Sequence, residues 1–290
     1  MIDDLSKICE ITENAKVNNT FKLDSKCFAM AKPNNVKELK ELITFIKKNK
    51  LKYTVLGNAS NIILPSFYDG VVIKLDKLNK YEINKTYVYA EGGCKINQLA
   101  NIVTSKGYAG LDFATGIPGT VGGSVYGNAG CFGSSISEIL KSATVFDGKD
   151  IIELKNEDFK FNYRYSMLKE HKDYIVLSCK FKIKKGNVDE LMALVKERTE
   201  KRIATQDLDH PSNGSMFRNP EGYSAGKLID DLGLKGFSVN DAAVSLKHAN
   251  FIINNGHCTS EDIIELANII KKKVKKEYDI DLVMEQEVLK

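Results

Sequence analysis

The sequence predicts an α+β fold with a larger N-terminal part and a smaller C-terminal part. At 290 residues the chain exceeds the usual size of a single hydrophobic core. Short strand-like runs alternate with amphipathic helices up to a boundary near Gly186. Directly after this boundary, Asn187 and Glu190 have the spacing of a capping box, which predicts the start of another helix.

Two helices are predicted in the N-terminal part. Apolar residues recur at helical spacing from Val36 to Ile46, after Pro33, and again from Ile96 to Val103, before Gly107. Strands are predicted where short apolar or alternating runs occur, at residues 53–56, 62–64, 71–75, 143–146, 151–154 and 174–183. Between the second helix and the later strands lies a long glycine-rich stretch, Gly110–Gly133.

The C-terminal part mixes the same elements on a smaller scale. A helix from residue 188 is followed by a polar loop over residues 206–213 and by a short helix that ends at Gly233. A strand pair and a helix opened by Ser260 come next, and residues 282–289 alternate as in a strand.

Composition excludes several classes of protein. A net charge of +4 with no basic face argues against nucleic-acid binding, and no apolar run approaches the ~20 residues of a membrane span. The acidic N-terminus, Met1–Asp4, is unlike a signal peptide. The six cysteines form no C-x-x-C pair, so we expect reduced thiols, no metal site and a cytoplasmic protein.

Two glycine-containing loops are candidates for ligand binding. The segment from Gly116 to Val125 has the densest glycine cluster, and such a backbone can approach a ligand closely and offer consecutive N–H groups to an anion. Its spacing fits neither the Rossmann fingerprint nor the P-loop. The earlier loop, Leu56–Asn61, joins two strands. A glycine-rich turn between core strands is the alternative, but we favour two loops that clasp the ends of one extended dinucleotide cofactor.

Several segments together identify a family. Gly110–Gly123, followed by Asn128–Gly130, closely resembles the flavin-binding signature of the UDP-N-acetylenolpyruvoylglucosamine reductase family. Further matches occur in the same order as in that family, at Leu56–Asn61, Tyr163–Ser166, Gly214–Pro220, Leu234–Gly236 and His248–Asn254. The resemblance covers essentially the whole chain, and its length and short loop after Lys169 are similar to the compact subtype that lacks a tyrosine loop.

The resemblance implies a fold and an activity. The fold is a two-part FAD-binding domain of the FAD-linked oxidase (PCMH-type) superfamily plus a smaller α+β substrate-binding domain. FAD would be held by residues 1–186, in subdomains of about 1–78 and 79–186, and the substrate by residues 187–290, with the last strand returning to the active site. Non-covalent FAD and NADPH would reduce a UDP-sugar enolpyruvyl ether to UDP-N-acetylmuramate for peptidoglycan synthesis. The protein would be a monomer.

The resemblance also implies roles for individual residues. Arg164, Ser215 and Glu285 correspond to catalytic positions, although Glu287 lies on the same face of a period-2 strand and stays an alternative. Ser215 would donate a proton to the carbanionic carbon of the substrate. The substrate-binding positions are Tyr163, Arg218 and Asn219. The cofactor-binding positions are Gly57, Asn58, Ala59, Ser60, Asn61, Gly116, Ile117, Gly119, Thr120, Gly122, Gly123, Ser124, Asn128, Ala129 and Gly130.

Three places depart from the family pattern. Glycines are usual in the family where this chain has Asp24-Ser25, Ala59 and Asp241-Ala242. A left-handed conformation at Ala59 would cost about 1–2 kcal/mol. These departures keep open the alternative of a flavin-binding protein that has lost turnover. A second alternative is an FAD-linked oxidase of the same superfamily with another substrate, although the match at Gly214–Pro220 argues against it.

Overall fold

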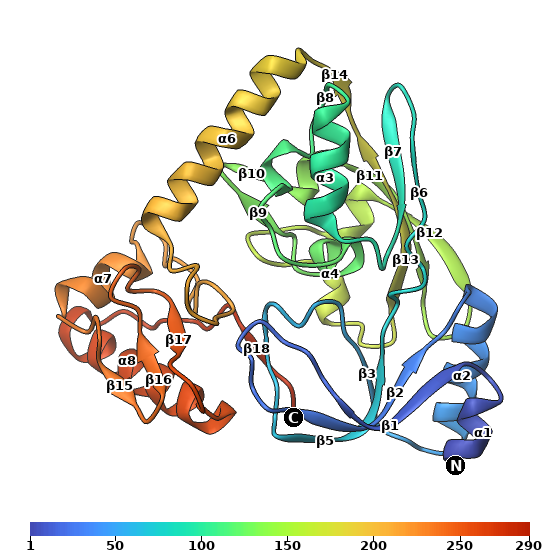
Figure 1. Cartoon of the computed structure of the whole chain (residues 1–290), viewed down its shortest axis with the longest axis horizontal. Coiled ribbons are helices and arrows are strands. Elements are labelled where there is room, and N and C mark those ends of the chain that lie inside the picture. Colours follow the sequence, from blue (N-terminus) through green and yellow to red (C-terminus); the bar gives the residue numbers. More distant parts are fainter. The chain divides into compact units, whose positions relative to one another are not determined.

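A computed structural model describes residues 1–290, and the chain's internal contacts divide it into two compact units (Figure 1). Unit 1 consists of residues 1–15, 28–57 and 69–199. Unit 2 consists of residues 16–27, 58–68 and 200–290. Two short N-terminal segments thus belong with the C-terminal residues. The predicted division of labour between residues 1–186 and 187–290 concerns ligands and stays a prediction.

A four-stranded sheet with one long helix forms the N-terminal half of unit 1. Its order is β1-β2-β5-β3, with bounds Glu10–Lys16, Lys26–Lys32, Phe67–Ile73 and Tyr53–Val55. The helix α2 (Val36–Lys48) confirms the predicted helix, and its buried face consists of Leu39, Leu42, Ile43 and Ile46. Asn35 caps α2, because its side chain accepts a hydrogen bond from the amide of Glu38. A short helix, α1 (Ile2–Ser6), packs Leu5 into the same core.

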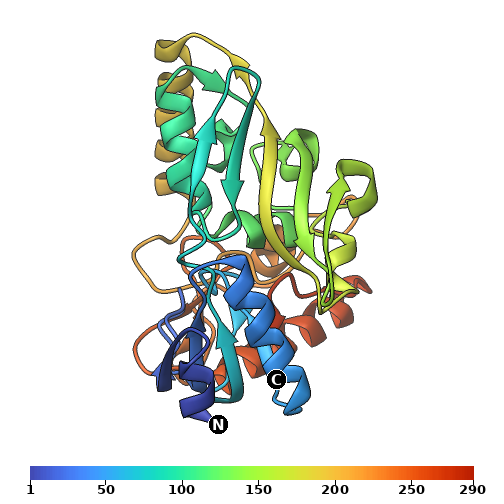
Figure 2. The same ribbon diagram turned by 90° about the vertical axis from the view of Figure 1, so that its right-hand side faces the viewer.

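A five-stranded antiparallel sheet forms the second half of unit 1. Its order is β12-β11-β13-β7-β6, with bounds Ile151–Lys155, Leu140–Phe146, Ile175–Lys182, Tyr87–Glu91 and Tyr81–Ile83. Figure 2 shows the teal β6–β7 hairpin beside the yellow strand β13. The predicted second helix, α3 (Ile96–Ser105), packs its apolar residues into the core of this sheet.

The glycine-rich stretch holds a helix that the sequence pattern does not reveal. This helix, α4 (Val121–Tyr126), buries Val121 and Val125 in the core of the five-stranded sheet. Thr120 caps it by accepting a hydrogen bond from the amide of Gly123. The short elements around it in unit 1 are η1 (Asp112–Ala114), β8 (Tyr108–Ala109) with β14 (Lys184–Lys185), β9 (Gly130–Cys131) with β10 (Ser134–Ser135), α5 (Ile136–Ile139), η2 (Asn156–Phe159) and η3 (Met167–Lys169).

The helix α6 (Val188–Thr205) leads from unit 1 into unit 2. Asn187 caps it as predicted, with its side chain accepting from the amides of Asp189 and Glu190. The C-terminal elements of unit 2 are α7 (Ala225–Asp231), β15 (Ser238–Val239), β16 (Ala242–Val244), β17 (Ile252–Asn254), α8 (Ser260–Tyr278) and β18 (Glu287–Val288). The predicted strand pair is therefore a three-stranded sheet, and α8 begins at Ser260 as predicted. None of the helices is both long and apolar enough to cross a bilayer.

The two N-terminal segments of unit 2 are built into its core. Phe21 and Ile63 are fully buried among the side chains of α7 and α8. The strand β4 (Ile62–Ile63) pairs in parallel with β18. The carbonyl of Phe21 accepts a hydrogen bond of 2.8 Å from Asn254. Residues far apart in the sequence thus complete one hydrophobic core.

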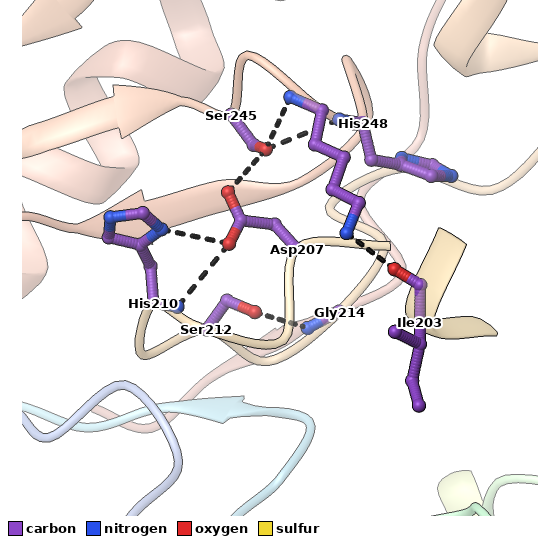
Figure 3. A network of polar contacts seen from close by, with 8 residues as sticks. Ile203, Asp207, His210, Ser212, Gly214, Ser245 and His248 are labelled. Carbon is purple, nitrogen blue, oxygen red and sulfur yellow. Dashed lines mark hydrogen bonds and ion pairs between the residues drawn. The ribbon is translucent and has the colours of Figure 1, made fainter. Parts of the chain in front are cut away.

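A network around Asp207 orders the polar loop that leads to Gly214 (Figure 3). The Asp207 carboxylate accepts a 2.6 Å hydrogen bond from the Ser245 hydroxyl, and its other oxygen lies 2.8 Å from Nδ1 of His210. The Ser245 oxygen in turn accepts from the amides of Lys247 and His248. Because Ser245 and His210 both bind the same carboxylate, rather than each other, this arrangement braces two loops and is not a nucleophilic triad.

Of the three departures from the family pattern, only Ala59 adopts a left-handed conformation. Its φ is +50°, whereas residues 24, 25 and 241–243 are not among the residues with positive φ. The Asp241 carboxylate accepts a 2.8 Å hydrogen bond from the amide of His257. The strain expected of the missing glycines is therefore confined to one residue, in the loop after β3.

We expect Asp207→Asn to lower the free energy of unfolding at pH 7 by about 1–3 kcal/mol, since it disrupts a buried, hydrogen-bonded carboxylate. Burial alone would raise the pKa of Asp207, but hydrogen bonds from Ser245 and His210 outweigh burial and hold this pKa below its usual value. The contribution of this carboxylate to the free energy of unfolding is therefore present above about pH 4, and it is lost as the pH falls through the folded-state pKa. Thermal unfolding at pH 7 and at lower pH measures this. The exposed neighbour Asp209 provides the control, Asp209→Asn, and an equal effect of both substitutions would contradict the prediction.

We expect Ala59→Gly to stabilise the protein by about 0.5–1 kcal/mol. Glycine removes the left-handed strain at φ +50°, and this gain exceeds the entropy that glycine loses on folding. Ala100, which is buried inside α3, provides the control, because Ala100→Gly should destabilise by about 1 kcal/mol. Denaturant unfolding of both variants measures the two signs, and a lower stability of Ala59→Gly would refute the assignment of strain.

Candidate active site

The first predicted ligand loop begins at Gly57, where the backbone lies very close to the side chain of Thr120. Gly57 follows β3, and a Cβ atom at this position would lie 2.6 Å from the Thr120 hydroxyl oxygen. Only glycine fits there without a shift of the neighbouring segment. Two of the predicted cofactor-binding positions, Gly57 and Thr120, thus lie side by side in unit 1. The remainder of this loop, Asn58–Asn61, belongs to unit 2.

The glycine loop uses some of its amides within the protein and leaves others available. The amide of Val121 donates to the Cys94 carbonyl and that of Gly122 to the Gly92 carbonyl. These amides therefore do not belong to the anion nest that the glycine spacing suggested. The two preceding amides, of Gly119 and Thr120, donate no hydrogen bond within the chain, so they are the ones that a phosphate could meet.

Two glycines that the sequence reasoning missed support this loop. A Cβ at Gly92 would lie 2.2 Å from the Val176 carbonyl oxygen, and one at Gly93 would lie 1.9 Å from that of Leu75. Both positions therefore require glycine, because Gly92 lies directly against the backbone of β13 and Gly93 against the backbone that follows β5. In the sequence, the Gly92-Gly93 pair just before the predicted helix at Ile96 is the pattern that could have indicated this close packing.

Asn128 links the glycine loop to the predicted catalytic arginine. It has a positive φ of 44° and is buried. Its side chain donates to the Asn162 carbonyl at 2.9 Å and accepts from the amide of Ser137 at 3.0 Å. The side chain is thus engaged within the protein, where it holds the start of the turn that follows Asn162.

That turn carries Tyr163 and Arg164. Asn162 and Tyr165 exchange two backbone hydrogen bonds, which places Tyr163 and Arg164 at the corner. Arg164 has a φ of +55°, its guanidinium donates to the Gly130 carbonyl at 3.1 Å, and it lies 5.2 Å from the centre of the Tyr163 ring. A non-glycine residue held in this strained conformation is common at functional sites. The turn therefore presents a planar cation suited to a carboxylate.

The other two predicted catalytic residues, Ser215 and Glu285, lie on neighbouring backbone segments of unit 2. Ser215 forms a bridge with Phe251, and the next residue, Met216, accepts a backbone hydrogen bond of 2.9 Å from Glu285. The side chain of Gln286 donates to the carbonyls of Gly214 and Ser215. The segment with Ser215 is thus held between the His248–Asn254 segment and the residues that lead into β18, Glu285 and Gln286.

The C-terminal strand also contacts the first ligand loop within unit 2. The Asn61 side chain donates to the Glu285 carbonyl at 3.1 Å, and the amide of Glu287 donates to the Asn61 carbonyl at 3.0 Å. Both glutamates therefore flank Asn61, a predicted cofactor-binding residue. The choice between Glu285 and Glu287 stays open.

Of the substrate-binding positions, Arg218 shows the feature expected of an anion site. Its Nε atom is buried and has no hydrogen-bond partner in the protein, which is costly unless a ligand supplies one. The Asn219 side chain accepts a 3.1 Å hydrogen bond from the amide of Ala225, so it also anchors the start of α7. The tyrosine, Tyr163, is about half exposed.

An extended flavin dinucleotide fits these residues. The free amides of Gly119 and Thr120 suit a diphosphate, and glycine at position 57 admits close packing of the backbone beside them. No group of three or more His, Cys, Asp or Glu side chains is arranged to hold a metal ion.

Comparisons with known proteins agree with this arrangement. The family model described as the FAD binding domain matches residues 29–153, and the one described as UDP-N-acetylenolpyruvoylglucosamine reductase, C-terminal domain, matches residues 206–289. The chain shares its fold with a solvent-stable cholesterol oxidase over 64% of its length, at a TM-score of 0.50 and 14% identity. This likeness concerns the fold alone.

Similarity to the reductases extends over the whole chain. A UDP-N-acetylenolpyruvoylglucosamine reductase from Caldanaerobacter subterraneus is 36% identical over 100% of this chain and 98% of the relative. One from Clostridium novyi is 39% identical over 94% of this chain and 90% of the relative. The crystal structure of the reductase from Thermus caldophilus matches with a TM-score of 0.81 and 30% identity, over 97% of this chain and 99% of that one. Because identity at this level spans both the flavin loops and the segments of Ser215 and Glu285, the chain belongs to the UDP-N-acetylenolpyruvoylglucosamine reductase family.

Proposed function

We propose that the protein is an FAD-dependent reductase that uses NADPH to convert UDP-N-acetyl-3-O-(1-carboxyvinyl)-glucosamine into UDP-N-acetylmuramate for peptidoglycan synthesis. The observation that carries the proposal is the full-length similarity to reductases named for this substrate, which includes the C-terminal segments. The proposal includes non-covalent FAD and a cytoplasmic monomer. Within it, residues 1–186 hold the cofactor and residues 187–290 the substrate.

FAD held by the loops at Gly57 and Gly119–Thr120 would supply hydride transfer from NADPH to the enolpyruvyl methylene. The residues of this chain stabilise the charge and move the proton. Arg164 offers a planar guanidinium to the substrate carboxylate, which gains negative charge as hydride arrives. The Ser215 hydroxyl then donates a proton to the adjacent carbanionic carbon.

The substrate diphosphate is assigned to Arg218 and Asn219. The buried, unpartnered Nε of Arg218 supports this assignment, because an anion there would satisfy a donor that the protein leaves unpaired. For Asn219 the candidate contact is the side-chain nitrogen, since the side-chain oxygen already accepts a hydrogen bond from the amide of Ala225. The tyrosine beside Arg164, Tyr163, would complete the substrate contacts.

Two alternatives lead to different observations. An FAD-linked oxidase with another substrate would require a different C-terminal part, and the match over residues 206–289 argues against it. A flavin-binding protein without turnover is favoured only by the strain at Ala59. A purified protein with a flavin absorption band that is bleached by NADPH, and restored by the enolpyruvyl substrate, supports the reductase. A coloured protein that the substrate leaves bleached would overturn it.

The substitution Ser215→Ala should separate the two half-reactions. Reduction by NADPH needs no proton from this hydroxyl, so we expect its rate to stay within a few-fold of the parent. Reoxidation by the enolpyruvyl substrate should slow by about 10²-fold or more, as is typical after loss of a general acid. Stopped-flow absorbance follows both steps on one sample. Ser212→Ala removes a nearby hydroxyl of the same loop and serves as the control. Parental reoxidation by Ser215→Ala would remove Ser215 from the mechanism.

A pair of matched substitutions decides between the two glutamates. We expect Glu285→Gln to slow reoxidation by the substrate about 10²-fold, because it neutralises a carboxylate at the reacting centre while preserving its size. Glu287→Gln should stay within a few-fold of the parent. The same stopped-flow measurement tests both variants, and the opposite pattern would assign the role to Glu287.

A further inference from the structure

A lysine that the sequence motifs do not include lies beside the cofactor loops. Lys74 directly follows β5, which runs parallel to β3 with Ile73 opposite Val55. Parallel strands end at the same edge of a sheet, so Lys74 and the loop at Gly57 leave the sheet side by side. The Lys74 ammonium donates a hydrogen bond to the Gly57 carbonyl.

The charge of Lys74 has no carboxylate partner. Its ammonium is partly buried, and no acidic side chain forms an ion pair with it. Burial lowers the pKa of Lys74; Asp76 opposes this shift, while Lys95 and Lys32 add to it. A cation withdrawn from water and bound only to a neutral carbonyl destabilises the protein unless an anion binds nearby.

The immediate neighbours of Lys74 are donors as well. Gly57 packs against Thr120, and the backbone amides of Gly119 and Thr120 donate no hydrogen bond within the chain. An ammonium and two amides thus lie within one small part of unit 1. Such a set of donors is suited to a phosphate group.

We propose that Lys74 is a cofactor-positioning residue, whose ammonium compensates the negative charge of the FAD diphosphate bound at Gly57 and Gly119–Thr120. The inference rests on FAD as the cofactor of the proposed function. The competing explanation is that Lys74 only braces the Gly57 carbonyl. The two explanations predict opposite effects of Lys74 on the stability of the flavin-free protein. An uncompensated cation lowers this stability, whereas a lysine that only holds the Gly57 carbonyl raises it.

The test compares Lys74→Met, Lys74→Arg and Lys149→Met in the full-length chain. Lys149 is an exposed lysine of unit 1, in the turn between β11 and β12, and serves as the control. Each protein is freed of flavin with chaotropic salt and titrated with FAD, with quenching of flavin fluorescence as the readout. Thermal unfolding of each flavin-free protein is measured in parallel.

Lys74→Met should raise the Kd for FAD by about 10- to 100-fold, the range of one charge-assisted contact, and should reduce the dependence of Kd on salt. Its flavin-free form should unfold at the same temperature as the parent or higher. Lys74→Arg should stay within a few-fold of the parent Kd, and Lys149→Met should match the parent in both measurements.

Two outcomes would overturn the inference. Parental affinity of Lys74→Met for FAD would show that the ammonium does not contact the diphosphate. A lower unfolding temperature of its flavin-free form, with an unchanged salt dependence of Kd, would show that Lys74 is only a brace. A parent protein that binds no FAD at all would instead contradict the proposed function, so the two failures are distinguishable.

Discussion

At Gly57, Gly92 and Gly93 the chain packs too closely to admit a side chain, and the arrangement of the cofactor loops depends on this packing. Gly92 and Gly93 lie against the carbonyls of Val176 and Leu75, and Gly57 lies against Thr120. These contacts fix the ends of β3 and β7 and the start of α4 relative to one another. They also determine which amides remain for a ligand, since Val121 and Gly122 donate to neighbouring carbonyls while Gly119 and Thr120 do not.

A second constraint acts in unit 2, where backbone pairing positions the chemistry. Ser215 lies between the His248–Asn254 segment and the residues that lead into β18, and Gln286 donates to the carbonyls of both Gly214 and Ser215. Since the hydroxyl of Ser215 is on a very short side chain, its position follows that of the backbone. The Asp207 network orders the loop just before this segment (Figure 3).

Much of the local structure could be predicted from the sequence, because periodicity directly reports which face of an element is buried. The helices α2 and α3 follow their apolar spacing, and α8 begins where expected. The helix α4 could not be found in this way, since its six residues include two glycines and depend on burial of Val121 and Val125. The motifs identified the family, but alternation alone could not choose between Glu285 and Glu287. The grouping of residues 16–27 and 58–68 with unit 2 depends on long-range contacts that no local pattern encodes.

The composition of unit 2 from three separated segments has a consequence for how the chain folds. Phe21 and Ile63 are synthesised early, yet the core that buries them is made by α7 and α8, and β4 finds its partner only in β18. During translation these early apolar residues must wait until about 200 further residues have been added, so they stay exposed on the nascent chain for ten seconds or more at typical elongation rates of about 5–20 residues per second. A folding path with such late closure favours capture by chaperones that bind extended apolar segments. A ribosome that stalls before residue 287 would also carry a chain in which all of unit 1 has been synthesised, but in which unit 2 still lacks strand β18.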